Sequence, residues 1–284
     1  MQTVAVSVLF AASILWGLSW LPLKYLNELG FDGLPLTLFL YLLMFVMMLP
    51  VIWSQRQYIP TSWRMLLLIA LLGGGAQLAF NTALIYGEVI RVMVLFYLVP
   101  LWGVLGGRIF LKEPIDRIRW LGMGLSIIGA FLIVGGMNAF IAPPSWIDGL
   151  ALLSGFLFAM NNIAFRLTQA VPVKIKLASM FMGAFLLASF GLALQGQSVN
   201  LELGWTAWTA LFAYGAIWMM IANFGTQWAV THLEAGRSSI IVIMELVTAV
   251  ISASLILGET MSSLEKVGGV MILLAAFIEA RKAR

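Results

Sequence analysis

Cysteine is absent from the 284 residues, histidine occurs once, and charged side chains make up only 10% of the chain. Without cysteine the protein has no disulfide and no thiolate chemistry, and a single histidine, His232, excludes a histidine-rich metal site. A soluble domain carries roughly 25% charged residues because its surface must face water. This chain therefore has too few charges to cover a soluble particle, and we expect no bound metal or cofactor.

Apolar residues take the place of the missing charges: 62% of the chain is hydrophobic and the mean hydropathy is +1.02. Runs such as 65–72 and 127–134 are apolar on every face, which is typical of helices and unlike the alternating strands of a membrane barrel. A helix needs roughly 20 apolar residues to cross the hydrocarbon core of a bilayer. We therefore predict an all-α integral membrane protein with ten transmembrane helices, at 4–26, 33–53, 64–87, 91–111, 118–137, 146–167, 174–194, 205–231, 237–257 and 264–281.

The 16 lysines and arginines are divided unevenly between the two ends of these spans. If the N-terminus is inside, Lys24, Arg91 and Lys266 lie outside and the other 13 lie inside. Cytoplasmic loops attract positive charge, so we expect both termini in the cytoplasm and the protein in the inner (plasma) membrane. The net charge of +4 then reports orientation, and we expect no nucleic-acid partner. The inside residues are Arg56, Arg64, Arg108, Lys112, Arg117, Arg119, Arg166, Lys174, Lys176, Arg237, Arg281, Lys282 and Arg284.

The chain also repeats itself at a shift of 146 residues, and each half, 1–140 and 141–284, holds five predicted spans. Because five is odd, the second half must enter the membrane from the opposite side, which makes the halves inverted repeats. Such repeats can exchange conformations around one central site and so provide alternating access. The residues that coincide include Gln77 with Asn223, Asn81 with Gln227, Arg91 with Arg237, and Glu113 with Glu259.

Amide side chains recur in pairs inside the predicted spans. Gln77 and Asn81 share one face of the third span, and Asn223 and Gln227 share one face of the eighth, because each pair is four residues apart. Asn161 and Asn162 lie midway along the sixth span and belong to the same set of candidates. Amides in lipid need either hydrogen-bond partners on neighbouring helices or a wet cavity, and both alternatives stay open here.

Glu245 is an acid deep within the ninth predicted span, where a carboxylate costs on the order of 2.5–3.5 kcal/mol. It could bind a substrate ammonium, exchange a proton, or be a protonated acid bonded to a backbone carbonyl. The face that contains it is polar apart from Ile241, and continues through Ser238, Thr248 and Ser252. The equivalent face of the fourth span is apolar and partly aromatic, with Val92, Leu95, Val99, Trp102 and Gly106. A cavity between these faces would suit an amino acid with an apolar side chain.

Trp16, Trp20 and Trp102 lie deeper in the predicted spans than the tryptophans near span ends, which are typical membrane anchors. Trp16 and Trp20 are four residues apart and face the same way. They could stack on a planar substrate or serve packing alone.

These features together resemble a known family. Trp16, Gly17 and Lys24 in the first span, Pro100 in the fourth, and the Lys112, Glu113, Pro114 sequence resemble the EamA-type members of the drug/metabolite transporter superfamily, and Glu245 and Glu259 repeat the pattern. Within it the chain looks most like YddG-type aromatic amino acid exporters of the inner membrane. That family often has Glu-Pro in the fourth span of each repeat. This chain has Val99 and Pro100 in one half, and Glu245 and Leu246 in the other.

The sequence therefore predicts a secondary transporter that exports amino acids, aromatic ones in particular, or related small metabolites. The candidate cavity comprises Trp16, Trp20, Gln77, Asn81, Val99, Trp102, Asn161, Asn162, Asn223, Gln227 and Glu245. We expect a monomer, because two five-helix repeats can enclose a cavity within one chain. The alternatives are a broad exporter of drugs or cationic metabolites, a channel or scaffold, and an intramembrane enzyme. The sequence offers the enzyme no converging catalytic set.

Overall fold

The computed structural model describes residues 2–112, 117–133, 136, 144–196, 199, 201–232 and 235–282. Helices and the short connections between them make up this described part of the chain, as the sequence predicted. The first half contains α1 (Gln2–Gly17), α2 (Trp20–Glu28), α3 (Gly33–Met47), α4 (Leu49–Ser54), η1 (Arg56–Tyr58), α5 (Ile59–Tyr86), α6 (Val89–Phe96), α7 (Val99–Phe110) and α8 (Arg117–Ile133). The second contains α9 (Trp146–Leu167), α10 (Val173–Gln195), α11 (Trp205–Phe212), the π-helix η3 (Ala213–Met219), α12 (Met220–His232), α13 (Ala235–Leu257) and α14 (Ser263–Lys282).

Six helical stretches in the described part are long and apolar enough to cross a membrane, and three shorter apolar helices accompany them. Large apolar side chains also face outward, for example Leu255, Leu194 and Phe190, which are 81%, 71% and 62% exposed. An outer surface of this kind needs lipid around it. The protein is therefore a multi-pass membrane protein, while the number of ten crossings stays a prediction. The six long stretches are Thr3–Glu28, Arg56–Tyr86, Val89–Phe110, Trp146–Leu167, Val173–Gln195 and Trp205–Ala229.

Three predicted spans that the sequence treated as single helices are interrupted in the structure. The first divides into α1 and α2, the second into α3 and α4, and the fourth into α6 and α7. A proline follows each interruption, at Pro22, Pro50 and Pro100. Proline has no N–H to donate to the carbonyl four residues earlier, and its ring crowds that carbonyl, so the helix bends or breaks there. The equivalent of Pro100 is Leu246, and α13 runs through that position without a break.

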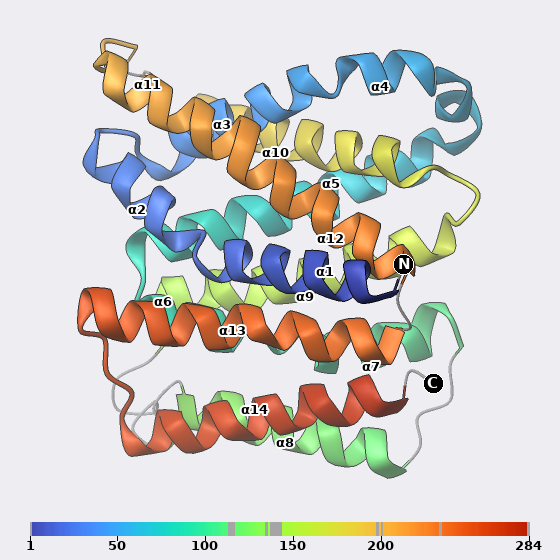
Figure 1. The fold of residues 1–284 in the computed structure, drawn as a ribbon, viewed down its shortest axis with the longest axis vertical. Helices are drawn as coiled ribbons and strands as arrows, with labels where there is room; N and C mark the ends of the chain where they lie inside the picture. The colour runs from blue at the N-terminus through green and yellow to red at the C-terminus, as the bar shows by residue number, and fades with distance from the viewer. Residues whose placement is uncertain are drawn as a thin grey trace.

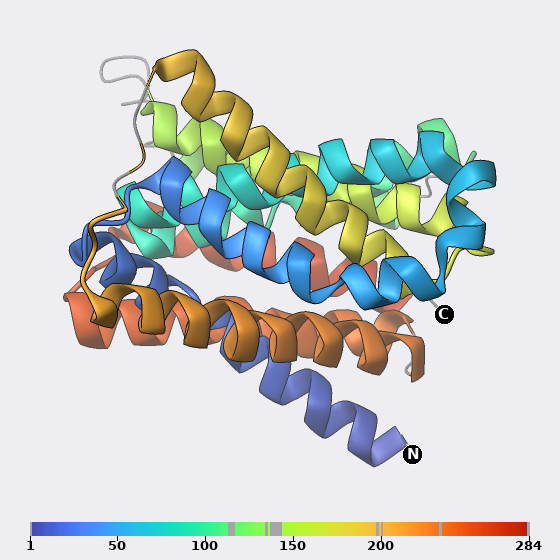
Figure 2. The ribbon, with the colours of Figure 1, turned by 90° about the horizontal axis from the view of Figure 1, so that it is seen from above.

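Helices from the first half of the chain pack against helices from the second half. From the first half, α1 packs on α12 and α13, and from the second half, α9 packs on α5, α6 and α7. The repeat relates these two sets of contacts to each other. Two further helix pairs, α3 with α10 and α8 with α14, each join a helix to its own repeat equivalent. Figure 1 shows α8 and α14 side by side at one edge of the helix array. Figure 2 shows α1 at the periphery, with its N-terminal end projecting from the other helices.

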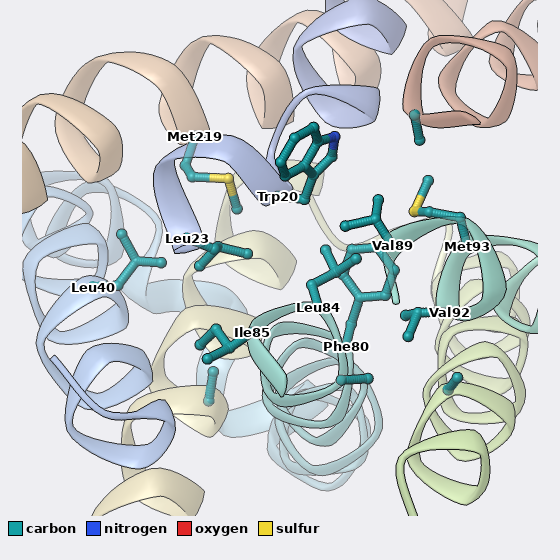
Figure 3. Packing of buried hydrophobic residues seen from close by; sticks show 14 of the residues in the cluster. Trp20, Leu23, Leu40, Phe80, Leu84, Ile85, Val89, Val92, Met93 and Met219 are labelled. Carbon is teal, nitrogen blue, oxygen red and sulfur yellow. The ribbon is translucent and has the colours of Figure 1, made fainter. Parts of the chain in front are cut away.

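The buried core lies where helices from both halves meet. Trp20 from α2, Phe80 and Leu84 from α5, and Val89 and Met93 from α6 converge there, as Figure 3 shows. All five side chains are at most 5% exposed. This apolar cluster borders the interruption between α6 and α7, so it places the residues around that interruption in a water-poor environment.

Candidate functional site

The interruption of the fourth span brings a tyrosine against the ninth. Tyr97 lies between α6 and α7, and its hydroxyl donates to the main-chain oxygen of Val242 on α13 over 3.0 Å. Glu245 follows Val242 by three residues on α13, so the two lie one turn apart on the same helix face. Tyr97 was not among the predicted site residues. Its position three residues before Pro100, where a helix break could be expected, is the sequence signal that could have identified it.

The first span approaches the same stretch of α13 through a glycine. Gly17, the last residue of α1, contacts the main-chain oxygen of Glu245 and the side chain of Thr248. A Cβ atom at position 17 would collide with both groups. Because Gly17 has no side chain, the backbones of α1 and α13 approach closely beside Glu245.

Trp20 is bound to the polar face of α13. It is 1% exposed, and its indole N–H donates to the Ser252 hydroxyl over 3.0 Å. Trp16 is half-buried and packs against the same core. The two tryptophans therefore differ in environment, although they lie on adjacent turns of one predicted span.

The apolar face predicted on the fourth span is divided by its interruption. Val92 and Leu95 are buried in α6, whereas Val99 and Trp102 are half-buried in α7. Trp102 meets Phe156 of α9 edge to face, with ring centroids 5.5 Å apart. Its indole nitrogen is buried and has no hydrogen-bond partner within the described residues.

The two amide side chains of the third span, which is α5, are buried where α5 packs on its neighbours. Gln77 accepts a hydrogen bond from the buried Tyr41 hydroxyl of α3 over 2.8 Å, which ties two helices together. Asn81 is 2% exposed, and its amide nitrogen finds no partner among the described residues. The side-chain oxygen of Asn161 on α9 is likewise buried and unpaired there, and a Cβ at Gly73 would lie 2.8 Å from it. Asn162, the next residue on α9, is exposed instead.

The eighth span does not mirror this arrangement. Asn223 is buried and donates to Met219 of its own helix over 2.8 Å, and Gln227 is half-buried. The π-helix η3 comes just before Asn223, and its Trp218 indole donates to the Leu15 carbonyl near the end of α1 over 3.0 Å. Widened turns of this kind, inserted in an α-helix, often occur at functional sites. The sequence repeat thus pairs residues that have different partners in space.

A charged network joins the two halves at one end of the helix array. The Arg91 guanidinium of α6 donates to both oxygens of Asp148 on α9, over 2.6 and 3.0 Å, and lies 3.6 Å from Glu265 of α14. The Glu259 carboxylate accepts from the amides of Val89 and Ile90, each over 2.9 Å, at the start of α6. These four side chains hold the ends of α6, α9 and α14 together. The sequence analysis had used Arg91 to assign orientation and to align the repeat, and had not placed it in a charged network.

Polar side chains of the candidate site gather along α13. Within the part of the chain that the structure describes, His, Asp and Glu side chains form no group of three or more that could hold a metal ion. Glu245, Tyr97, Trp20 and Ser252 instead place polar groups along α13, next to interruptions in the first and fourth spans. Interrupted helices in membranes free backbone groups that can bind substrates or ions.

Comparison with known proteins adds a family and a fold. A model of the EamA-like transporter family matches residues 3–135 and again residues 145–279. One solved crystal structure of a protein superposes with a TM-score of 0.63 at 17% sequence identity, covering 98% of this chain and 96% of that one. At that identity the likeness shows the fold alone. No curated protein matches the sequence significantly.

Proposed function

Because this chain belongs to the EamA-like transporter family, which carries small molecules across membranes, we propose that it exports amino acids, aromatic ones in particular. The observation that carries the proposal is Glu245, an acid on the polar face of α13 beside the interrupted fourth span. A carboxylate there can bind a substrate ammonium, because few other groups in an apolar bundle can compensate the positive charge of the ammonium.

The chemistry of the other candidate side chains suggests how each would contact the substrate. Trp16, Trp20 and Trp102, with Val99, offer an apolar and aromatic surface for the substrate side chain. Gln77, Asn81, Asn161, Asn162, Asn223 and Gln227 would orient the polar end of the substrate. Asn81 and Asn161 support this role best, because each has a buried polar atom without a partner in the described chain. Gln77 supports it least, since Tyr41 already occupies its oxygen.

Transport would proceed by rocking two inverted repeats, 1–140 and 141–284, around this central site. Two observations support this mechanism: the family model matches the chain twice, and the helix contacts occur in equivalent pairs. Inverted repeats provide alternating access because each half can adopt the conformation of the other. The protein would act as a monomer in the inner membrane, with both termini in the cytoplasm.

Counterflow tests the proposal directly. Purified protein would be reconstituted in liposomes loaded with unlabelled phenylalanine, and the uptake of labelled phenylalanine measured with a panel of competitors. We expect saturable uptake that tryptophan and tyrosine block and alanine does not. If no amino acid supports counterflow, the substrate assignment is wrong, whereas membership of the family is unaffected.

A broad exporter of cationic compounds is the second candidate, and the surroundings of Glu245 favour it specifically. An acid on α13, the helix to which Tyr97 and Trp20 bond at Val242 and Ser252, offers a counter-ion together with aromatic side chains, which also suit quaternary ammonium groups. Strong competition by cationic dyes or quaternary amines in the same liposomes, with weak competition by tyrosine, would select this function.

A further inference from the structure

Acidic side chains are missing from two long stretches of the chain, 33–87 in the first half and 149–201 in the second. The same stretches contain five cations. Arg56 and Arg64 lie in η1 and near the start of α5, and the other three lie where α9 leads into α10. Figure 1 and Figure 2 both show these two connections next to each other at one end of the helix array. We call this region the basic end; its cations are Arg56, Arg64, Arg166, Lys174 and Lys176.

An apolar cluster holds the two connections of the basic end together. Leu66 of α5 packs on Val171 and Ile175 of the second connection, and all three side chains are at most 7% exposed. Lys176 is buried in the second connection, where its ammonium donates to the Phe165 carbonyl over 3.0 Å. Cations from the two halves of the chain are therefore held on one surface.

The acids of the charged network lie at the opposite end of the helices from these cations. Asp148 lies in the first turn of α9 and Arg166 in its last, and the 22 residues of this helix extend for roughly 33 Å. Asp148 and Glu265 are moreover occupied by Arg91. Interactions between exposed charges are largely screened beyond about 10 Å. The positive charge of the basic end is therefore not offset by these acids.

Two arginines of the basic end each lie over an exposed indole ring. The guanidinium carbon of Arg56 is 4.3 Å from the centroid of the Trp53 ring, and that of Arg64 is 5.4 Å from the Trp63 ring. The two tryptophans are 72% and 52% exposed. A stacked guanidinium keeps the N–H donors in its plane free, and these donors match two oxygens of a phosphate. Neither arginine forms an ion pair within the described residues, so both are open to an anion at the surface.

An apolar face continues from these indoles along α5. Trp63, Leu67 and Leu71 follow one another at steps of four residues, so they lie on one helix face. The two leucines are 48% and 49% exposed. A soluble anion would leave such a face uncovered, whereas the acyl chain of a lipid covers it. A cation and an indole at the helix end, followed by apolar side chains, thus match a phospholipid standing in one leaflet.

We propose that the basic end is a binding site for an anionic phospholipid. The headgroup phosphate accepts from the guanidinium groups of Arg56 and Arg64, and the exposed Lys174 adds positive charge from the second half. An acyl chain lies along Leu67 and Leu71. The site selects anionic lipid because the ammonium of a zwitterionic headgroup is repelled by the same arginines. This binding is separate from the proposed transport site and does not depend on the identity of the substrate.

A local fluorescent reporter tests the lipid preference. The chain has no cysteine, and Gln57 is exposed next to Arg56, so Gln57→Cys places a single label at the basic end. The labelled protein would be reconstituted in phosphatidylcholine vesicles that contain a lipid with a nitroxide high on its acyl chain, either phosphatidylglycerol or phosphatidylcholine. We expect half-quenching at an about fivefold or more lower fraction of the phosphatidylglycerol, and high salt should reduce this preference. A label at Ser263→Cys, exposed beside Glu265, should show no preference for phosphatidylglycerol.

Charge-removing variants then locate the site. We expect Arg56→Gln combined with Arg64→Gln to bring the two lipids to equal quenching of the Gln57→Cys label. Arg108→Gln removes one charge from an exposed arginine at the end of α7, and should leave the preference in place. Equal quenching in the protein with both arginines, or a preference that survives their loss, would overturn the proposal.

Inorganic phosphate distinguishes a lipid site from a site for soluble anions. Added at constant ionic strength, it should not change the preference, because it cannot cover the apolar face of α5. If phosphate abolishes the preference, the basic end binds a soluble anion and the lipid assignment is wrong. The measurement needs no substrate, so its outcome is independent of whether amino acids are transported.

Discussion

At the scale of single residues, burial and hydrogen-bond partners separate the polar side chains of this bundle into two kinds. Gln77 and Trp20 are paired across helices by Tyr41 and Ser252, so their bonds hold the fold together. Asn81, Trp102 and Asn161 each have a buried polar atom with no partner in the described chain. Unpaired buried polar atoms are costly, and at a binding site a ligand or water can satisfy them.

The Glu245→Gln variant tests the charge itself. Glutamine keeps the size of the side chain but cannot be ionised, so it offers a substrate ammonium only a neutral acceptor. Losing a charge-assisted hydrogen bond costs about 1.5–3 kcal/mol, and we expect counterflow to fall by roughly tenfold to a hundredfold. The amount of protein in the membrane should be unchanged. Normal transport by this variant would remove Glu245 from the site.

Gly17 and Gly103 provide a matched test of close helix packing. A Cβ atom at Gly17 would collide with the Glu245 backbone, whereas one at Gly103 would have nothing within 4 Å. We expect Gly17→Ala to destabilise the protein by about 1–3 kcal/mol, because overpacking displaces α1 from α13. Gly103→Ala should change stability by less than about 0.5 kcal/mol or raise it, since alanine favours helix more than glycine does. Thermal unfolding in detergent compares the two, and equal effects would contradict the packing seen at Gly17.

At the scale of helices, one difference between the repeats decides which span is interrupted. The fourth span has Pro100 and divides into α6 and α7, whereas the ninth has Leu246 and continues as α13. The result is an asymmetric pair at the site: a broken helix that presents Tyr97, facing a continuous helix that presents Glu245. The asymmetry arises from a single missing N–H, which is a local property of proline.

Pro100→Leu should make the fourth span resemble the ninth. Leucine restores the N–H that can bond to the Phe96 carbonyl, and proline within a helix costs about 3 kcal/mol, so we expect unchanged or higher thermal stability. Counterflow should nevertheless fall about tenfold or more, because a continuous span moves Tyr97 away from Val242. Pro60→Leu is the control, since Pro60 lies in the first turn of α5 where no helix bond is lost. Equal loss of counterflow in both variants would argue against a role for the interruption.

The charged network at the ends of α6, α9 and α14 is a second feature at this scale. Arg91 binds Asp148 through two hydrogen bonds, and the Asp148 side chain is 4% exposed. In a double-mutant cycle of Arg91→Lys and Asp148→Asn, we expect a coupling on the order of 1.5–3 kcal/mol in thermal unfolding. Arg56→Lys, at an exposed arginine above the Trp53 ring, should change stability by less than about 0.5 kcal/mol. Additive effects of the two network variants would show that the pair contributes little.

At the scale of the whole molecule, the absence of native cysteine makes orientation directly measurable. A single cysteine in place of Ser263, the first residue of α14, or of Gln57, in η1, would be the sole thiol in each variant, and both positions are exposed. With both termini in the cytoplasm, a membrane-impermeant maleimide should label Ser263→Cys in intact cells, and Gln57→Cys only after the membrane is opened. The reverse pattern would show that the protein is inserted the other way round.

The sequence alone was sufficient for the class of protein and its family. Helical membrane spans depend on composition and on runs of apolar residues, which are properties of short segments, and the all-helical, multi-pass structure confirms them. The family was also recognisable, because its residues recur in both halves and the match extends over most of the chain. Even the interruptions were within reach, since proline acts on the carbonyl four residues before it.

The tertiary structure alone decided which polar side chains meet. The repeat treats Gln77 and Asn223 as equivalent, yet one bonds to a neighbouring helix and the other to its own. Asn161 is buried and its neighbour Asn162 is exposed, and Tyr97 reaches a residue 145 positions away. These outcomes depend on how each helix is rotated and on where backbones can approach, as Gly17 permits beside Glu245. Packing between distant segments determines both, and no local pattern contains that information.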